Sequence, residues 1–139
     1  MIGRIKQGLL FIFGKYKEEW NEEIENVLSE KEFVLFKNMS EYDKIHSYRL
    51  YKLVSEDTLL KSSIIYKKLA LLHDCGKYHA SLYRRVKKVL IGEKSLENHS
   101  EISYLKLKNV NLKLAELARK HHQKSEDIYM KRFQLLDDK

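Results

Sequence analysis

The sequence of 139 residues has no proline and only five glycines, so it is poor in the residues that form tight turns between strands. Its one cysteine, Cys75, excludes an internal disulfide and is typical of a protein from a reducing cytoplasm. The longest strongly apolar run, Leu9–Phe13, is far shorter than the ~20 residues that a membrane span needs. These absences predict an all-α, cytoplasmic protein without a transmembrane segment.

Charge is abundant, with 27 basic and 20 acidic residues and a net charge of +7. Such a balance indicates either a solvated, lysine-rich surface or a field that attracts phosphate-bearing partners. Lysine and glutamate intermingle along most of the chain, which favours the solvated surface. No helix-turn-helix or zinc-finger pattern accompanies the charge, so a nucleic-acid partner is disfavoured.

Apolar residues recur at helical spacing along the chain. Ser40 is a good N-cap for the helix that follows it, and Gly76 favours a helix end. We expect the helices of residues 1–39 to pack on, or extend, a domain of residues 40–139. The predicted helices cover residues 5–16, 18–28, 33–36, 41–54, about 57–76, 81–91, about 95–108, 112–124 and 126–138.

Several polar residues lie on the apolar faces of these helices. His46, His73, His121 and Asp137 are each in phase with the apolar stripe of a separate helix, and Asp74 follows His73 directly. A single inward histidine is more often a hydrogen-bonded core residue than a ligand. Burying this whole set is costly unless its members satisfy one another. A divalent cation does so in one step, because it binds neutral imidazole and ionised carboxylate together.

Five segments carry a resemblance to a known family, and they lie between residues 40 and 138. They resemble the HD-domain superfamily of metal-dependent phosphohydrolases, whose motif is a His, a His-Asp pair and a distant Asp on separate helices. The resemblance implies an HD-domain helical bundle of about five core helices, with N-terminal helices outside it. The segments are "HSYRLYKLV", "ALLHDCGK", "NHSEISYLKL", "ARKHHQ" and "FQLLDD".

The resemblance also implies the ligands of the metal. A first ion would be held by His46, His73, Asp74 and Asp137. A second ion would be held by His99 and His121, with Asp74 as a bridge and His122 as an alternative ligand or a phosphate contact. Mixed nitrogen and oxygen ligands suit Fe, Mn, Co or Ni.

The implied reaction is hydrolysis of a nucleotide or another small phosphate monoester or diester by a metal-activated water. Asp74 and Lys77 would be catalytic residues, with Lys77 neutralising a substrate phosphate. Arg84 and Arg85 would line the approach of the anionic substrate. The alternatives are an exposed Lys77 that compensates the helix dipole and a solvated face for the two arginines.

The sequence departs from the family in ways that leave a second function open. Ser100 replaces the proline expected after His99. The segment after His122 lacks the "GYP" of members that cleave cyclic dinucleotides, and Gln123 replaces their Glu. That subclass is therefore disfavoured. The alternative function is a non-catalytic HD module that binds a nucleotide or a partner for signalling.

Overall fold

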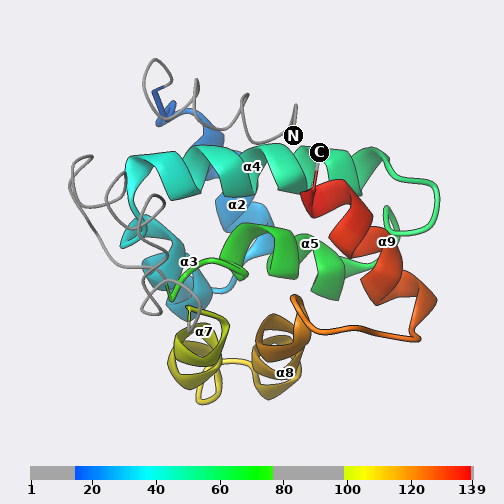
Figure 1. Cartoon of the computed structure of the whole chain (residues 1–139). Coiled ribbons are helices and arrows are strands. Elements are labelled where there is room, and N and C mark those ends of the chain that lie inside the picture. The colour runs from blue at the N-terminus through cyan, green and yellow to red at the C-terminus, as the bar shows by residue number, and fades with distance from the viewer. Residues whose placement is uncertain (1–14, 77–98, 139) are drawn as a thin grey trace, which may run out of the picture.

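The computed structural model describes residues 15–76 and 99–138 (Figure 1). Within these ranges every regular element is a helix, which confirms the predicted all-α fold. Two helices precede residue 40 and five follow it. The helices are α2 (Trp20–Val27), α3 (Glu30–Lys37), α4 (Glu41–Glu56), α5 (Ile64–Leu72), α7 (His99–Leu107), α8 (Leu112–Lys120) and α9 (Ile128–Asp137).

The long helix α4 lies along one side of the molecule, and the apolar helix α5 runs beneath it (Figure 1). Ser40 caps α4, because its hydroxyl oxygen accepts the backbone N–H of Asp43 at 3.2 Å. The run Leu69–Leu72 at the end of α5 is fully buried. A helical turn that is apolar on every side belongs at the centre of a core.

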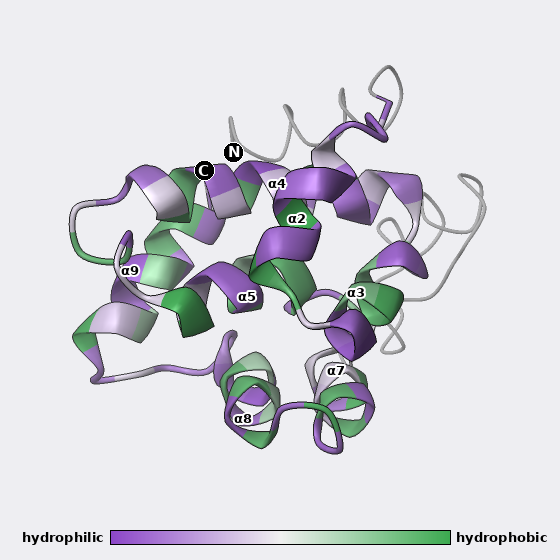
Figure 2. Cartoon of the chain, turned by 180° about the vertical axis from the view of Figure 1, so that it is seen from behind, coloured by the Kyte–Doolittle hydropathy of each residue, from purple (hydrophilic) through white to green (hydrophobic). Residues whose placement is uncertain are grey.

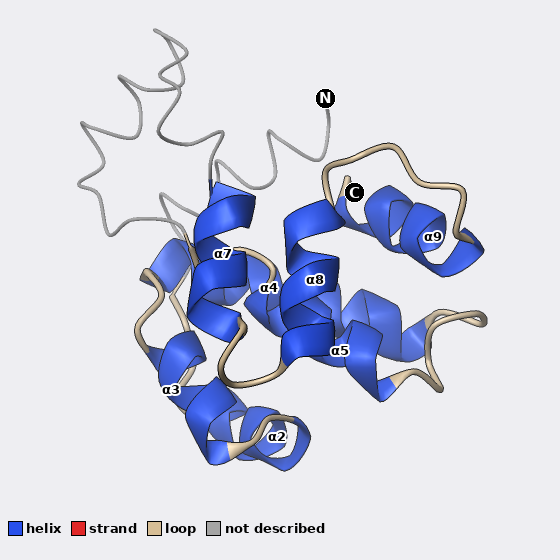
Figure 3. Ribbon diagram, turned by 90° about the horizontal axis from the view of Figure 1, so that it is seen from below, coloured by secondary structure: helices blue, strands red, loops and turns tan. Residues whose placement is uncertain are grey.

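Helices α7 and α8 form a hairpin below α5, and α9 packs on α4 (Figures 1 and 3). Helix α8 contacts α5, so the C-terminal ends of α5, α8 and α9 come together beside the middle of α4. The chain from residue 41 onward thus directs three helix ends to one place.

Helices α2 and α3 also contribute to the core. Ile24 and Phe36 are fully buried in the same apolar cluster as α5, and Trp20 stacks on Tyr48 of α4 at 4.2 Å between ring centroids. Figure 2 shows the hydrophobic segments of α2 and α5 meeting near the centre of the molecule. The domain boundary between residues 39 and 40 stays a prediction.

Helix α5 ends at Leu72, earlier than the expected end at Gly76. Residues 73–76 form a turn instead, and Ser103 of α7 holds it. The fully buried Ser103 hydroxyl accepts the N–H of Gly76 at 2.9 Å and donates to the carbonyl of His73 at 3.1 Å. These bonds replace those of a continuing helix, since buried backbone groups need partners.

Two other expectations lie outside the described residues: the helix at 81–91 and most of the helix at 5–16. Among the described helices, none has the length and apolar character needed to cross a membrane.

Glu32 joins three parts of the fold. Its side chain is 2% exposed, and it completes a capping box with Ser29 at the start of α3. It also accepts from the Lys68 ammonium of α5 at 2.9 Å and from the Asn111 amide at 3.0 Å. Burial opposes its ionisation, but the Ser29 N–H, Lys68 and Asn111 outweigh burial and lower the pKa of Glu32 below 4.5.

The lowered pKa predicts a dependence of stability on pH. Ionised Glu32 stabilises the fold above pH 4.5, and this contribution is lost as the pH falls through the folded-state pKa. We expect Glu32→Gln to lower the free energy of unfolding by about 1–3 kcal/mol at neutral pH, with a smaller difference in acid. Urea unfolding at a series of pH values measures the stability difference at neutral pH and in acid. The exposed Glu30→Gln in the same helix turn should change stability by less than about 0.5 kcal/mol, and an equal effect of the two variants would contradict the prediction.

Candidate metal centre

Two histidines cap helices in the same way and turn the same nitrogen into the core. His73 ends α5 and His121 ends α8, and each is 1% exposed. The Nδ1 atom of His73 lies 3.0 Å from the carbonyl oxygen of Ala70, and Nδ1 of His121 bonds the carbonyl oxygen of Ala118. A carbonyl only accepts, so both Nδ1 atoms carry a proton, and Nε2 is the nitrogen that each ring offers to a metal when the ring is neutral. Metal-binding histidines are typically oriented by such a bond.

Two carboxylates approach these imidazoles from different elements. One oxygen of Asp137 lies 3.2 Å from Nε2 of His46 and 3.4 Å from Nε2 of His73. An oxygen of Asp74 lies 3.2 Å from the same Nε2 of His73. Ligand atoms of His46, His73 and Asp74 all lie within 4.8 Å of one another. The structure therefore brings together all four residues expected around the first ion.

His121 and His122 extend this cluster. The ring centroid of His121 lies 5.2 Å from that of His73 and 3.9 Å from that of His122. His122 is exposed, whereas His121 is buried. The other expected residues are not placed: His99 is the first residue of α7 with its side chain outside the description, and Lys77, Arg84 and Arg85 lie outside the described residues.

The charges of the cluster are strongly coupled. Burial disfavours the imidazolium of His73, but Asp74 and Asp137 outweigh burial and raise the pKa of His73 well above 6.5. Burial and the nearby charge of His73 lower the pKa of His121 to about 3, so His121 is neutral. Burial opposes ionisation of Asp137, yet His73 and His46 hold its pKa far below the usual range.

These residues fit a transition-metal ion. The donor set mixes imidazole nitrogens with carboxylate oxygens, which suits Fe, Mn, Co or Ni. The positive charge of protonated His73 compensates the carboxylates of Asp74 and Asp137, and a divalent cation supplies the same compensation while binding neutral imidazole. His46, His73, Asp74 and Asp137 would hold the ion, and His121 lies beside them.

A protein-family model, described as the HD domain, matches residues 43–137. The chain belongs to the HD-domain family. The match covers more than half of the chain and includes all four residues of the cluster. No curated protein and no solved structure matches the chain. HD domains are typically metal-dependent phosphohydrolases.

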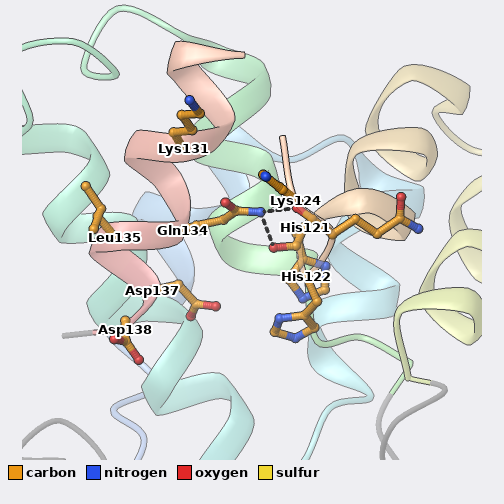
Figure 4. A pocket seen from close by; sticks show the side chains of 9 residues that line it. His121, His122, Lys124, Lys131, Gln134, Leu135, Asp137 and Asp138 are labelled. Atoms are coloured by element: carbon orange, nitrogen blue, oxygen red, sulfur yellow. Dashed lines mark hydrogen bonds between the residues drawn. The ribbon is translucent and has the colours of Figure 1, made fainter. Parts of the chain in front are cut away.

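A pocket of about 640 Å³ opens beside the histidine and aspartate cluster of this HD domain (Figure 4). His121 and Asp137 belong both to the cluster and to the pocket wall, so the pocket reaches the cluster. Figure 4 shows the Asp137 carboxylate and the two histidine rings facing one another across it. The lining residues are His121, His122, Gln123, Lys124, Lys131, Gln134, Leu135, Asp137 and Asp138.

Gln134 is a residue of the site that the sequence analysis missed. Its side-chain amide donates to the carbonyl of His121 at 3.0 Å and to that of Gln123 at 2.7 Å (Figure 4). Carbonyls at a helix C-terminus lack hydrogen-bond donors within the helix. Gln134 of α9 supplies a donor to the C-terminal end of α8. One turn later α9 presents Asp137. Gln134 thus ties the helix end of His121 to the helix of Asp137, a contact that neither periodicity nor a motif indicates.

The link through Gln134 predicts a loss of metal affinity when its donors are removed. Gln134→Met keeps the length of the side chain but no hydrogen-bond donor, so the spacing between His121 and Asp137 is no longer fixed. We expect Mn²⁺ to bind about 10–100-fold more weakly, as for other groups that orient ligands. Isothermal titration calorimetry measures the affinity. The control Gln123→Met changes a neighbouring side chain while keeping the backbone carbonyl, and equal affinities of the two variants would refute the role.

Proposed function

We propose that this HD domain is a metal-dependent phosphohydrolase that hydrolyses a nucleotide or another small phosphate ester. The observation that carries the proposal is the convergence of His46, His73, Asp74 and Asp137 at the inner edge of an open pocket. A phosphate in that pocket would lie against the metal centre.

The residues of the cluster would have different roles in such a site. A bound divalent ion supplies a Lewis acid that lowers the pKa of water and offsets charge on phosphoryl oxygens. His46 and His73 offer nitrogen donors, and Asp74 and Asp137 balance the charge of the ion. Asp74 sits in the turn after α5, next to His73, where it can also orient the attacking water.

The wall of the pocket offers donors to the substrate. His122 is exposed on this wall, within ring contact of the buried His121, and can donate a hydrogen bond to a phosphate oxygen. A volume of about 640 Å³ lies in the range of nucleotide-sized ligands. We keep Lys77 as a proposed phosphate contact, because it directly follows the turn of Asp74 and Gly76 in the sequence.

A panel of nucleotides, phosphomonoesters and phosphodiesters tests the proposal. The full chain is loaded with Mn, Fe, Co or Ni, and released phosphate or monoester is measured. We expect turnover of at least one compound class by the wild type and none by His73→Ala. Tight nucleotide binding without turnover in all four metal forms would overturn the proposal and favour the non-catalytic HD module.

A further inference from the structure

We infer that the substrate carries a second anionic group, held by Lys124 and Lys131 at the end of the pocket away from the metal centre. This inference rests on the proposed function, because it names the substrate class of the same site. The two lysines and the metal-binding Asp137 line one continuous pocket. A single ligand can therefore contact both ends.

Acidic and basic side chains lie at different ends of the pocket along α9. Asp137 and Asp138 lie at one end with the ring of His122, whereas Lys124 and Lys131 lie on the other side of Gln134 (Figure 4). Lys131 precedes Asp137 by six residues on the same helix (137 − 131). At 1.5 Å of rise per residue, their backbones are roughly 9 Å apart along the helix axis. That spacing exceeds the size of one phosphate and suits two anionic groups on one small molecule.

The lysines are available to an incoming anion. The described ion pair of Lys131 is with Glu126 at 3.6 Å, and the two side chains are 53% and 86% exposed. An ion pair so exposed to water contributes little, so exchanging Glu126 for a substrate anion costs little. Lys124 is exposed in the segment between α8 and α9, and its flexible stem lets the ammonium follow a phosphate.

The wall of the pocket also has an apolar residue. Leu135 is 60% exposed, although leucine usually lies in a core, and it lines the pocket between Lys131 and Asp138 on α9. An apolar contact on the wall suits the sugar or base of a substrate whose phosphates are bound elsewhere in the pocket. The substrate class is accordingly a small bisphosphate, such as a nucleoside with a phosphate on each side of its ribose.

Steady-state kinetics of the metal-loaded full chain test this inference. The probes are adenosine 3′,5′-bisphosphate and adenosine 5′-monophosphate. We expect a KM about tenfold lower for the bisphosphate, from two exposed charge contacts. The double variant Lys124→Gln/Lys131→Gln should raise the KM of the bisphosphate about tenfold and leave kcat and the KM of the monophosphate within about twofold. The control Lys108→Gln/Lys113→Gln removes the same charge from exposed positions outside the pocket and should change neither KM.

Two outcomes would overturn the inference, and a binding assay separates them from failure of the proposed function. Equal KM values for both probes, unchanged by the lysine variant, would reject the second anionic site while hydrolysis stands. An equal rise in the KM of the bisphosphate in the lysine variant and in its control would assign the effect to the overall charge of the protein. If neither probe is hydrolysed, calorimetry decides: tighter, lysine-dependent binding of the bisphosphate supports the site, and its absence rejects it.

Discussion

Replacing His73 with alanine is expected to weaken Mn²⁺ binding by about a hundred- to a thousandfold. His73 is 1% exposed, and its Nε2 lies within 3.4 Å of oxygens from both Asp74 and Asp137. Structural Zn²⁺ sites bind with roughly 10–16 kcal/mol over four ligands, so one ligand of four accounts for about 2.5–4 kcal/mol. Removing His73 also takes a positive charge away from the carboxylates of Asp74 and Asp137. Calorimetric titration of metal-free protein measures the affinity.

The same substitution opens a cavity next to Phe133, whose ring centroid lies 5.8 Å from that of His73. Circular dichroism therefore has to show that the variant is folded, and His73→Asn supplies a second variant with a smaller cavity. His122→Ala is the matched control, because that histidine is exposed and outside the first set of ligands. A folded His73 variant that binds Mn²⁺ as tightly as His122→Ala does would contradict the prediction.

Asp74→Asn should lower kcat by about a thousandfold while the protein stays folded. Asparagine keeps the shape of the side chain, but it removes one negative charge from the cluster and one anionic ligand. The charge matters because Asp74 is 3% exposed, where electrostatic interactions are stronger than in water. Removing even one uncharged group that stabilises the transition state at a reacting centre costs about 10²–10³-fold in kcat, and we expect an anionic ligand to count for at least as much. The rate of phosphate release, measured at saturating metal, tests the prediction.

Saturating metal separates catalysis from weaker binding in this variant. Asp43→Asn is the control, since Asp43 is a buried carboxylate of α4 that accepts from Ser40 at the start of the helix rather than in the cluster. We expect it to change stability without a large effect on kcat. Turnover of Asp74→Asn within tenfold of the wild type would exclude Asp74 as a catalytic residue.

Local patterns in the sequence predicted much of this arrangement. The N-cap Ser40 correctly marked the start of α4, and helical phase placed His46, His73 and Asp137 inward, where the structure has them close together. Phase works here because the apolar stripe of each helix must face the core, so a polar residue on that stripe is carried inward.

Contacts between helices could not be predicted in this way. Ser103 and Gln134 each donate a hydrogen bond to a carbonyl at the C-terminal end of another helix. Ser103 also accepts the N–H of Gly76 in the turn that follows α5. The partners of Ser103 lie 27 and 30 residues away in the sequence, and those of Gln134 lie 13 and 11 residues away. No spacing of residues within one helix indicates these contacts.

The basic residues that would contact the substrate are equally hard to predict from the sequence. In the sequence Arg84 and Arg85 stand out as adjacent charges, and they remain predicted contacts outside the described residues. Lys124 and Lys131 carry no local signal. They line the pocket because the segment between α8 and α9 folds back beside the helix that holds Asp137.

X-ray absorption at the Mn edge of the loaded wild-type chain tests most directly whether one metal centre forms from His46, His73, Asp74 and Asp137. We predict a bound ion with mixed nitrogen and oxygen ligands and scattering from at least two imidazoles, and with one imidazole fewer in His46→Ala. A spectrum with oxygen ligands alone, or the same imidazole scattering in His46→Ala, would contradict the account.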